Sequence, residues 1–255
     1  MYLKITKPSA KMLSRPNNQC LLETECLFGE QVNILDENSE WVFCKLLTDN
    51  YKGWVKKRDL GNIKPPTHRV ITNRSFLYKK NESKSDCFYY IPMGSQLSVK
   101  KIQKNWAEVY LPELDYPRKT AFVPSNHIVR LDHKTKDWVS IAEQLIGVPY
   151  KWGGRDTIGL DCSSLLQLSY QTFGSNIPRN TSEQVLLNKK AINKIEDLKR
   201  GYVVFWEGHV GIMVDNLNCL HANGHHMRII SEPLENILLR MNDRYKIIKI
   251  LDFNN

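Results

Sequence analysis

The sequence predicts a multidomain chain in which two small all-β domains precede one α+β domain. The first observation is an internal repeat, in which Gly29 recurs as Gly94 and Trp41 recurs as Trp106 at the same interval. The second is a change of pattern near residue 137, where apolar residues take up helical spacing and then give way to short apolar runs. Repeated short strands are typical of small barrels, and helices followed by strands are typical of an α+β layout.

The repeated segments read as short strands joined by turns. An aromatic-valine pair follows the tryptophan in each copy, Trp54-Val55 in the first and Phe122-Val123 in the second. Two barrels of about 60 residues each fit this spacing, because closure of a sheet removes its exposed edges. A segment with two adjacent prolines, 63–67, is the predicted linker between them. The predicted domains are residues 1–62, 68–131 and 137–255.

The third domain begins with helical patterns. Apolar residues at helical spacing run from Trp138 to Ile146. A glycine-rich loop then leads to Cys162, which opens a second helical pattern, and Asn180 is predicted to cap a short helix over 183–188. The remaining apolar runs read as strands at 203–206, 209–214, 219–222, 228–230 and 245–251.

The composition is that of a globular chain, since 42% of the 255 residues are hydrophobic and 25% are charged. No stretch approaches the ~20 apolar residues that span a bilayer, and the start lacks a signal-peptide core, so we expect no membrane partner and no export. Six cysteines without a CxxC pair favour a reducing compartment, which predicts a cytoplasmic location. The net charge of +9 arises from scattered Lys and Arg, so no nucleic-acid partner is expected, and the oligomeric state stays open.

Cys162 is the candidate nucleophile. It lies in the first turn of a predicted helix, with Asp161 at the N-cap position, where unpaired backbone N–H groups and the helix dipole favour an anion. Because the thiolate is the form of cysteine that attacks, this placement predicts a reactive thiol. The alternative is that Cys162 fills the core, as small buried cysteines usually do.

A cysteine nucleophile needs an imidazole base and a third group that orients the imidazole. His209 begins one predicted strand and His221 lies in the next, so a hairpin would bring both rings to one edge of the sheet. We therefore predict His209 as the general base and His221 as its orienting partner, with His225 and His226 in a loop. A metal site that adds Cys219 and His225 to this pair has no recognised zinc spacing, so no metal and no cofactor are expected.

Six short motifs occur in order along the third domain: Pro149-Tyr-Lys-Trp-Gly-Gly154, Gly159-Leu-Asp-Cys-Ser163, Ile177-Pro-Arg179, Val204-Phe205, His209-Val-Gly-Ile212 and Leu220-His-Ala222. Together they resemble the NlpC family of bacterial cell-wall cysteine peptidases. The repeats, and the first more closely than the second, resemble bacterial SH3-like domains. Two such domains ahead of an NlpC-type domain are similar to the γ-D-glutamyl-diamino-acid endopeptidase subgroup. The resemblance implies two SH3-like barrels followed by a papain-like α+β catalytic domain.

The resemblance also implies an activity. Members of this subgroup hydrolyse the γ-D-Glu–diamino acid bond of cell-wall peptides that carry a free N-terminal L-Ala, which points to peptidoglycan recycling. The residues that would recognise the free amine are Asp161 and Ser163 beside the nucleophile and Tyr51 of the first SH3-like domain. An acidic residue of that domain, Glu23 or Glu25, is a further candidate, and the sequence leaves the choice open. The diamino acid is also left open.

The same resemblance implies that Tyr150 lies near the developing oxyanion, together with the Cys162 backbone N–H. Two positions depart from the family pattern. Ser164 stands where a glycine is usual, and Tyr202 stands where an aspartate is usual. Ser164 is a small change that a helix tolerates. The aspartate that Tyr202 replaces is not part of the triad, so we expect altered packing there and no loss of activity. The sequence leaves open whether either change alters the rate.

Two other functions are open on the sequence alone. An inactive catalytic fold with SH3-like domains would be a peptidoglycan-binding module. A thiol-dependent enzyme of the same superfamily would act as an amidase or acyltransferase. The complete Cys-His-His set argues against an inactive fold, and the amine-binding set favours the peptidase.

Overall fold

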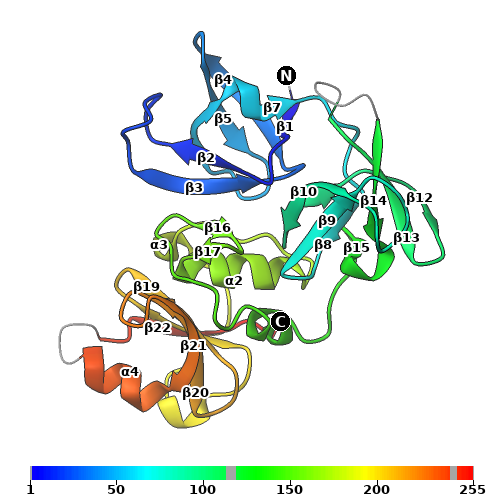
Figure 1. Ribbon diagram of the computed structural model, residues 1–255. Helices are drawn as coiled ribbons and strands as arrows, with labels where there is room; N and C mark the ends of the chain where they lie inside the picture. Colours follow the sequence, from blue (N-terminus) through cyan, green and yellow to red (C-terminus); the bar gives the residue numbers. More distant parts are fainter. Residues whose placement is uncertain (1, 113–118, 242–245, 255) are drawn as a thin grey trace. The chain divides into compact units, whose positions relative to one another are not determined.

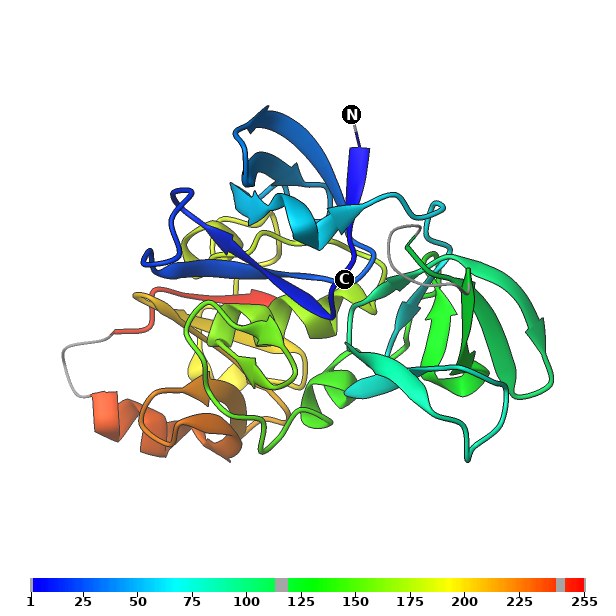
Figure 2. The ribbon, with the colours of Figure 1, turned by 45° about the horizontal axis from the view of Figure 1, so that its top comes forward.

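The computed structural model describes residues 2–112, 119–241 and 246–254, shown as ribbons in Figures 1 and 2. The chain forms two compact units. Unit 1 consists of Met1–His133 together with Arg155–Thr157, and unit 2 consists of Lys134–Gly154 and Ile158–Asn255. A short stretch of the glycine-rich loop thus belongs to the unit formed by the first half of the chain.

The first repeat of unit 1 folds as one antiparallel sheet in the order β3-β2-β6-β5-β4-β1-β7 (Figure 1). Strand β5 shows why its residues form a strand, because Val42, Cys44 and Leu46 alternate with more exposed positions and point into the core. The elements are β1 (Tyr2–Ile5), β2 (Ser9–Leu13), β3 (Leu22–Leu27), β4 (Gln31–Glu37), β5 (Trp41–Leu46), β6 (Lys52–Lys56), the 3-10 helix η1 (Lys57–Asp59) and β7 (Leu60–Gly61).

The second repeat of unit 1 forms two sheets, in the orders β10-β9-β14-β13-β12 and β11-β8-β15. Its core includes Phe28 of the first repeat, whose ring lies 5.9 Å from that of Tyr89. The elements are β8 (His68–Val70), β9 (Arg74–Tyr78), β10 (Cys87–Pro92), β11 (Gln96–Leu97), β12 (Val99–Gln103), β13 (Trp106–Tyr110), β14 (Thr120–Pro124), the 3-10 helix η2 (Ser125–His127) and β15 (Ile128–Arg130).

The contact between the two repeats requires a glycine. Gly29 has a φ of +78°, and a Cβ at this position would lie 1.8 Å from the backbone oxygen of Gln96. The Gln96 backbone N–H donates to the Phe28 carbonyl at 2.8 Å, which closes the same contact. Only a residue without a side chain fits this conformation and this approach.

The segment Arg155–Thr157, which includes strand β16 (Arg155–Asp156), is held by side chains of both repeats of unit 1. The Arg155 guanidinium makes a two-pronged ion pair with Glu30, with distances of 2.7 and 2.8 Å. Glu25 accepts the backbone N–H groups of Arg155 and Asp156 at 2.9 and 3.1 Å. From the second repeat, the Tyr90 hydroxyl donates to the Asp156 carboxylate at 2.7 Å.

Unit 2 has an antiparallel sheet in the order β21-β20-β19-β18-β22, with α4 beside β21 (Figures 1 and 2). Helix α2 packs against β19, β20 and α1. The elements are α1 (Val139–Glu143), β17 (Gly159–Leu160), α2 (Cys162–Gln171), α3 (Thr181–Gln184), the 3-10 helix η3 (Ile195–Asp197), β18 (Tyr202–Trp206), β19 (His209–Met213), β20 (Asn218–Asn223), β21 (Arg228–Pro233), α4 (Leu234–Met241) and β22 (Lys249–Asp252).

Several predicted element bounds were wrong. Helix α1 ends at Glu143, before Ile146. Helix α3 spans Thr181–Gln184 instead of 183–188, and the Asn180 side chain makes no capping hydrogen bond. The last strand begins at Lys249, and Tyr245, where we predicted its start, lies outside the described residues. Helix α4 was not predicted.

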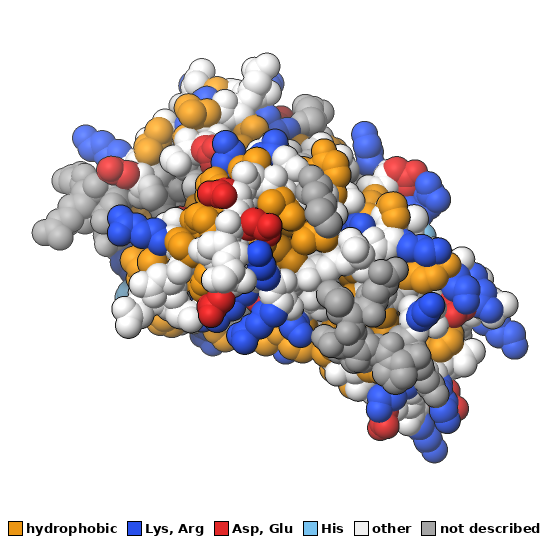
Figure 3. All heavy atoms as spheres, turned by 90° about the horizontal axis from the view of Figure 1, so that it is seen from above, with side chains coloured by type: hydrophobic (Ala, Val, Ile, Leu, Met, Phe, Trp, Pro, Cys, Tyr) orange, Lys and Arg blue, Asp and Glu red, His pale blue; other side chains and the backbone are white. Residues whose placement is uncertain are grey.

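Within the described residues, no helix is long and apolar enough to cross a membrane. All six cysteines are free thiols. On the face shown in Figure 3, Lys and Arg side chains are dispersed among hydrophobic, acidic and uncharged ones. This dispersion matches the scattered positions of the basic residues in the sequence.

Candidate active site

Cys162 is the first residue of α2, and a capping box fixes this helix start. The Asp161 carboxylate accepts the Ser164 backbone N–H at 2.9 Å, while the Ser164 hydroxyl accepts the Asp161 backbone N–H at 3.0 Å. Ser164 therefore makes one of the two side-chain hydrogen bonds of the capping box, at a position where glycine is usual in the NlpC family. The loop before it is tight, since a Cβ on Gly154 would lie 2.3 Å from the Gly159 carbonyl oxygen.

The Cys162 thiol is buried, with 8% of its surface exposed. Burial, reinforced by the charge of Asp161, raises the pKa of this thiol to about 12. The backbone N–H groups of Val210 and Ser163 donate to the sulfur and act in the opposite direction, as does Arg179, but more weakly. The helix start favours an anion, but desolvation outweighs it, so the thiol needs a base to remove its proton.

The two predicted histidines lie next to each other. His209 begins β19, His221 lies in β20, and Nε2 of His209 is 2.9 Å from Nδ1 of His221. Burial lowers the pKa of His209 to about 3, with smaller contributions from the charges of His221 and Arg240. Burial also lowers the pKa of His221. Both rings are therefore neutral at neutral pH, and a neutral imidazole is the form that accepts a proton.

The fold brings Cys162 to this histidine pair. Helix α2 packs on β19 and β20, and the Val210 N–H that donates to the Cys162 sulfur directly follows His209 in the chain. The structure thus gathers a thiol, an imidazole and a second imidazole from one helix and two neighbouring strands. This is the set of groups that nucleophilic catalysis by cysteine requires.

Tyr150 belongs to the same group of residues. Its pKa is raised to about 12, mainly by burial and further by the charges of Cys162 and Asp161. The phenol therefore keeps its proton at neutral pH and acts as a hydrogen-bond donor. A neutral donor near the nucleophile suits an oxyanion that forms during the reaction.

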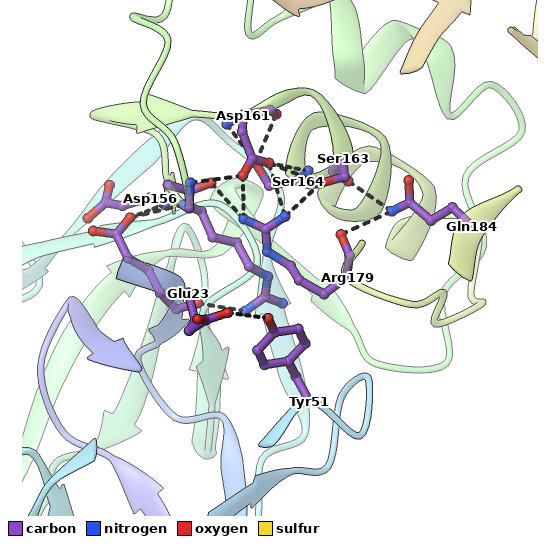
Figure 4. Close-up of polar contacts among 12 residues, drawn as sticks. Glu23, Tyr51, Asp156, Asp161, Ser163, Ser164, Arg179 and Gln184 are labelled. Atoms are coloured by element: carbon purple, nitrogen blue, oxygen red, sulfur yellow. Dashed lines mark hydrogen bonds and ion pairs between the residues drawn. The ribbon is translucent and has the colours of Figure 1, made fainter. Parts of the chain in front are cut away.

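Arg179 is a site residue to which the sequence reasoning gave no role (Figure 4). Its guanidinium donates to both carboxylate oxygens of Asp161, at 2.7 and 3.0 Å, and to the Ser163 hydroxyl at 2.7 Å. All three side chains are buried. The signal was present in the motif Ile177-Pro-Arg179, but a charge in a loop gives no sign of its partner before the fold is known.

The candidates in unit 1 separate into two groups. The Tyr51 hydroxyl donates to Glu23 at 2.9 Å, and both side chains are partly exposed (Figure 4). Glu25 is 4% exposed, and its carboxylate holds the backbone of Arg155 and Asp156. Of the two acidic candidates, Glu23 is the one that presents a carboxylate to solvent.

The other residues considered in the sequence lie in a turn or in the core of unit 2. His225 and His226 lie in the turn between β20 and β21. Tyr202 is buried in a cluster with Leu198 and Val204, where it contributes to the core. Among the residues that the structure describes, no group of three or more His, Cys, Asp or Glu side chains is arranged to hold a metal ion.

Gly211 leaves the room that the Cys219 sulfur occupies. A Cβ at this position would lie 2.4 Å from the Cys219 sulfur and 3.6 Å from Cβ of His221. We expect Gly211→Ala to lower the free energy of unfolding by about 1–3 kcal/mol through overpacking against Cys219. It should also lower kcat, because a shift of Cys219 moves β20, the strand that carries His221. Thermal unfolding and steady-state kinetics measure the two effects.

The double variant Gly211→Ala/Cys219→Ala is the control for this effect, because removal of the Cys219 sulfur makes room for the added methyl group. It should recover most of the stability and rate. A double variant as impaired as Gly211→Ala alone would contradict the explanation.

A cysteine at the start of a helix that packs on a sheet with two hydrogen-bonded histidines is an arrangement typical of thiol-dependent enzymes. The comparisons with known proteins agree with this class. The profile of the NlpC/P60 family matches residues 147–242, and that of the bacterial dipeptidyl-peptidase Sh3 domain matches residues 12–60.

The chain is 26% identical to the gamma-D-glutamyl-L-lysine dipeptidyl-peptidase of Bacillus subtilis, an alignment that covers 79% of this chain and 72% of that protein. It is 24% identical to dipeptidyl-peptidase 6 of Lysinibacillus sphaericus, with 84% of each chain covered. Among solved structures, an NlpC/P60 family protein of Bacillus cereus has the same fold, with a TM-score of 0.84 over 100% of both chains at 18% identity.

The chain contains an NlpC/P60 domain at residues 147–242 and a bacterial SH3 domain at residues 12–60. This confirms the family resemblance drawn from the motifs. The protein is mostly β, with an SH3-like N-terminal domain and an NlpC/P60 domain that has few helices. The assignment of the second repeat as another SH3-like barrel, and the division at residues 62, 68, 131 and 137, stay predictions.

Proposed function

We propose that this protein is a cysteine peptidase that hydrolyses the γ-D-Glu–diamino acid bond of cell-wall peptides bearing a free N-terminal L-Ala. The observation that carries the proposal is the arrangement of Cys162, His209 and His221 in an NlpC/P60 domain. Relatives named as dipeptidyl-peptidases for γ-D-glutamyl-L-lysine support peptidoglycan peptides as the substrate class. A role in peptidoglycan recycling in the cytoplasm is part of the proposal.

The first half of the reaction forms an acyl-enzyme. His209 takes the proton of the Cys162 thiol as the sulfur attacks the γ-carbonyl carbon of D-Glu. The carbonyl oxygen becomes an oxyanion, which accepts hydrogen bonds from the Cys162 backbone N–H and the Tyr150 hydroxyl. The imidazolium of His209 then protonates the amine of the diamino acid, the C–N bond breaks, and a thioester remains on Cys162.

The second half of the reaction releases the product. Neutral His209 takes a proton from a water molecule, whose oxygen attacks the thioester carbon. The second tetrahedral intermediate collapses, the C–S bond breaks, and the sulfur regains the proton from His209. Because burial keeps both the thiol and the imidazole neutral before substrate binds, each cycle begins and ends with the same neutral pair.

The substrate ammonium needs a carboxylate partner when it leaves water. We propose Glu23 with Tyr51 as this partner, since both are partly exposed and joined by a hydrogen bond. Asp161 and Ser163 also belong to the proposed substrate-binding set, but the hydrogen bonds that they already make limit how they could bind the ammonium. The Asp161 carboxylate already accepts hydrogen bonds from Arg179, Ser163, Ser164 and Gly153, so an ammonium would have to displace one of them.

Peptide hydrolysis tests the proposed function. L-Ala-γ-D-Glu-diaminopimelate, its lysine counterpart and the N-acetylated form of each are incubated with the protein, and the released dipeptide is measured. We expect cleavage of the free-amine peptides only. Glu23→Gln should lower kcat/KM for these peptides roughly 10- to 100-fold, because a charge-assisted hydrogen bond contributes about 1.5–3 kcal/mol. Equal cleavage of the acetylated peptides would remove the amine-recognition proposal, and no cleavage of any peptide would remove the peptidase.

A further inference from the structure

The hydrogen-bonded series of histidines continues beyond His221 to a carboxylate. Nε2 of His221 lies 2.9 Å from Oε1 of Glu232, a residue of the neighbouring strand β21. Glu232 in turn forms an ion pair with Arg240 of α4, whose Nη1 donates to Oε2 at 3.1 Å. The His221 side chain is 1% exposed and that of Glu232 is 11% exposed. The series therefore runs from His209 on β19 through β20 and β21 to α4.

Glu232 is a carboxylate, with no proton of its own. Burial opposes its charge, but the hydrogen bonds and charges of Arg240 and His221 outweigh this effect and lower its pKa. The contact between Glu232 and His221 therefore requires a proton on Nε2 of His221. Asn223 Nδ2 also lies 3.1 Å from this nitrogen, but a neutral amide competes weakly with a carboxylate for the same position.

This proton determines where the other protons lie. With Nε2 protonated, Nδ1 of the neutral His221 ring is an acceptor. The 2.9 Å contact then requires that Nε2 of His209 donates to it. The ring of His209 is neutral as well, so its Nδ1 carries the lone pair. That nitrogen is the atom left to accept the proton of Cys162.

We propose that Glu232 is a positioning residue that fixes the tautomers of both histidines, so that His209 presents an unprotonated Nδ1 to Cys162. The inference rests on the proposed function for its kinetic consequence. The predicted tautomers of the two rings do not depend on which substrate is cleaved. Without the carboxylate, each ring would be free to bind its proton at the other nitrogen, and the His209 lone pair would then point away from the thiol.

The variant Glu232→Gln keeps the shape and removes the charge, so that its amide is able either to accept or to donate at Nε2 of His221. Ring-nitrogen NMR of histidine-labelled protein distinguishes protonated from unprotonated nitrogens. In the wild-type protein we expect Nε2 protonated and Nδ1 unprotonated in both His209 and His221. In the variant we expect mixed tautomers, and kcat roughly 10- to 100-fold lower with KM unchanged, since a general base contributes ~10²–10⁴ in rate.

Glu235→Gln is the matched control. It removes the same charge from the first turn of α4, where the side chain is exposed and has no bond to His221. This variant should keep the wild-type tautomers and the wild-type kcat. If Glu232→Gln unfolds at the assay temperature, Glu232→Asp retains the charge and should retain the tautomers in a folded protein.

The outcomes are distinct. Unchanged tautomers in folded Glu232→Gln would overturn the inference, whether or not kcat falls, because a fall in kcat alone fits a structural tie between β21 and α4. An NMR pattern in the wild-type protein with Nδ1 of His209 protonated would also overturn it. Failure of the peptidase assay leaves the NMR measurement intact, so the proposed function can fail separately from this inference.

Discussion

Replacing Cys162 with alanine is expected to lower kcat for the free-amine peptide by about 10⁴- to 10⁶-fold, as loss of a catalytic nucleophile does in related mechanisms. The variant should fold normally, because it removes one sulfur atom from a small buried position, a change of about 1 kcal/mol. Hydrolysis is followed by release of the diamino acid. The control is Cys219→Ala, a second buried cysteine of unit 2, which should keep nearly full activity.

The same cysteine has an expected pH dependence. The pKa of Cys162 is raised to about 12, so the thiolate fraction below that pH should rise about tenfold for each pH unit. In the absence of substrate, alkylation of Cys162 by iodoacetamide should therefore accelerate steadily between pH 7 and pH 10. A rate that is already high and flat across this range would show a preformed thiolate–imidazolium pair, and would contradict a neutral resting state.

The second large effect is expected on stability, at the ion pair of Arg155 with Glu30. Arg155 is 0% exposed and Glu30 is 1% exposed. Burial alone would lower the pKa of Arg155, but the charge and hydrogen bonds of Glu30 raise it above its usual value. Glu30 also accepts the Leu27 backbone N–H and the Thr48 hydroxyl. The four hydrogen bonds use the full acceptor capacity of the carboxylate.

Arg155→Met is expected to lower the free energy of unfolding of unit 1 by about 3–5 kcal/mol, because it leaves the Glu30 charge buried without its partner. Urea unfolding followed by tryptophan fluorescence measures the change. Arg155→Met combined with Glu30→Leu should recover part of the lost stability, because an apolar pair replaces the ionic one. The recovery should be partial, because the Leu27 N–H and the Thr48 hydroxyl lose their acceptor.

The control for this experiment is Arg130→Met. Arg130 forms a comparable two-pronged ion pair with Asp132, but both side chains are largely exposed. Water screens such a pair, so this variant should unfold at the wild-type urea concentration. If Arg155→Met and Arg130→Met lowered the free energy of unfolding equally, burial of the ion pair would contribute nothing to stability.

The parts of the site that were predictable from the sequence are those that local pattern determines. Glycines, an N-cap aspartate and helical spacing placed Cys162 at a helix start, and two short apolar runs placed His209 and His221 on neighbouring strands. The pKa of Cys162 was not predictable in this way. It depends on how much water the neighbouring elements exclude, and that is a property of the packed domain.

Other features needed the tertiary structure. Arg179 lies in a loop and Arg155 lies in the two-residue strand β16. Charged side chains are exposed in most proteins, and the burial of these two depends on the carboxylates of Asp161 and Glu30, which only the fold brings to them. In the sequence, nothing distinguishes Glu232 from other charged residues near the end of a strand. Helix α4, in contrast, had a signal that was missed, because Leu234, Ile237 and Leu238 recur at helical spacing.

The path of the chain between the two compact units has a consequence for how such a protein can be divided. The chain passes from one unit to the other after His133, after Gly154 and again after Thr157. A protease cut after His133 would therefore leave two fragments that hold each other through Arg155 and Asp156. A gene fusion that exchanged the first 133 residues for another domain would remove Glu25 and Glu30 and leave Arg155 without its partners. Recombination at this boundary is thus tolerated only if the incoming domain supplies a matching carboxylate, or if the three-residue segment changes with it.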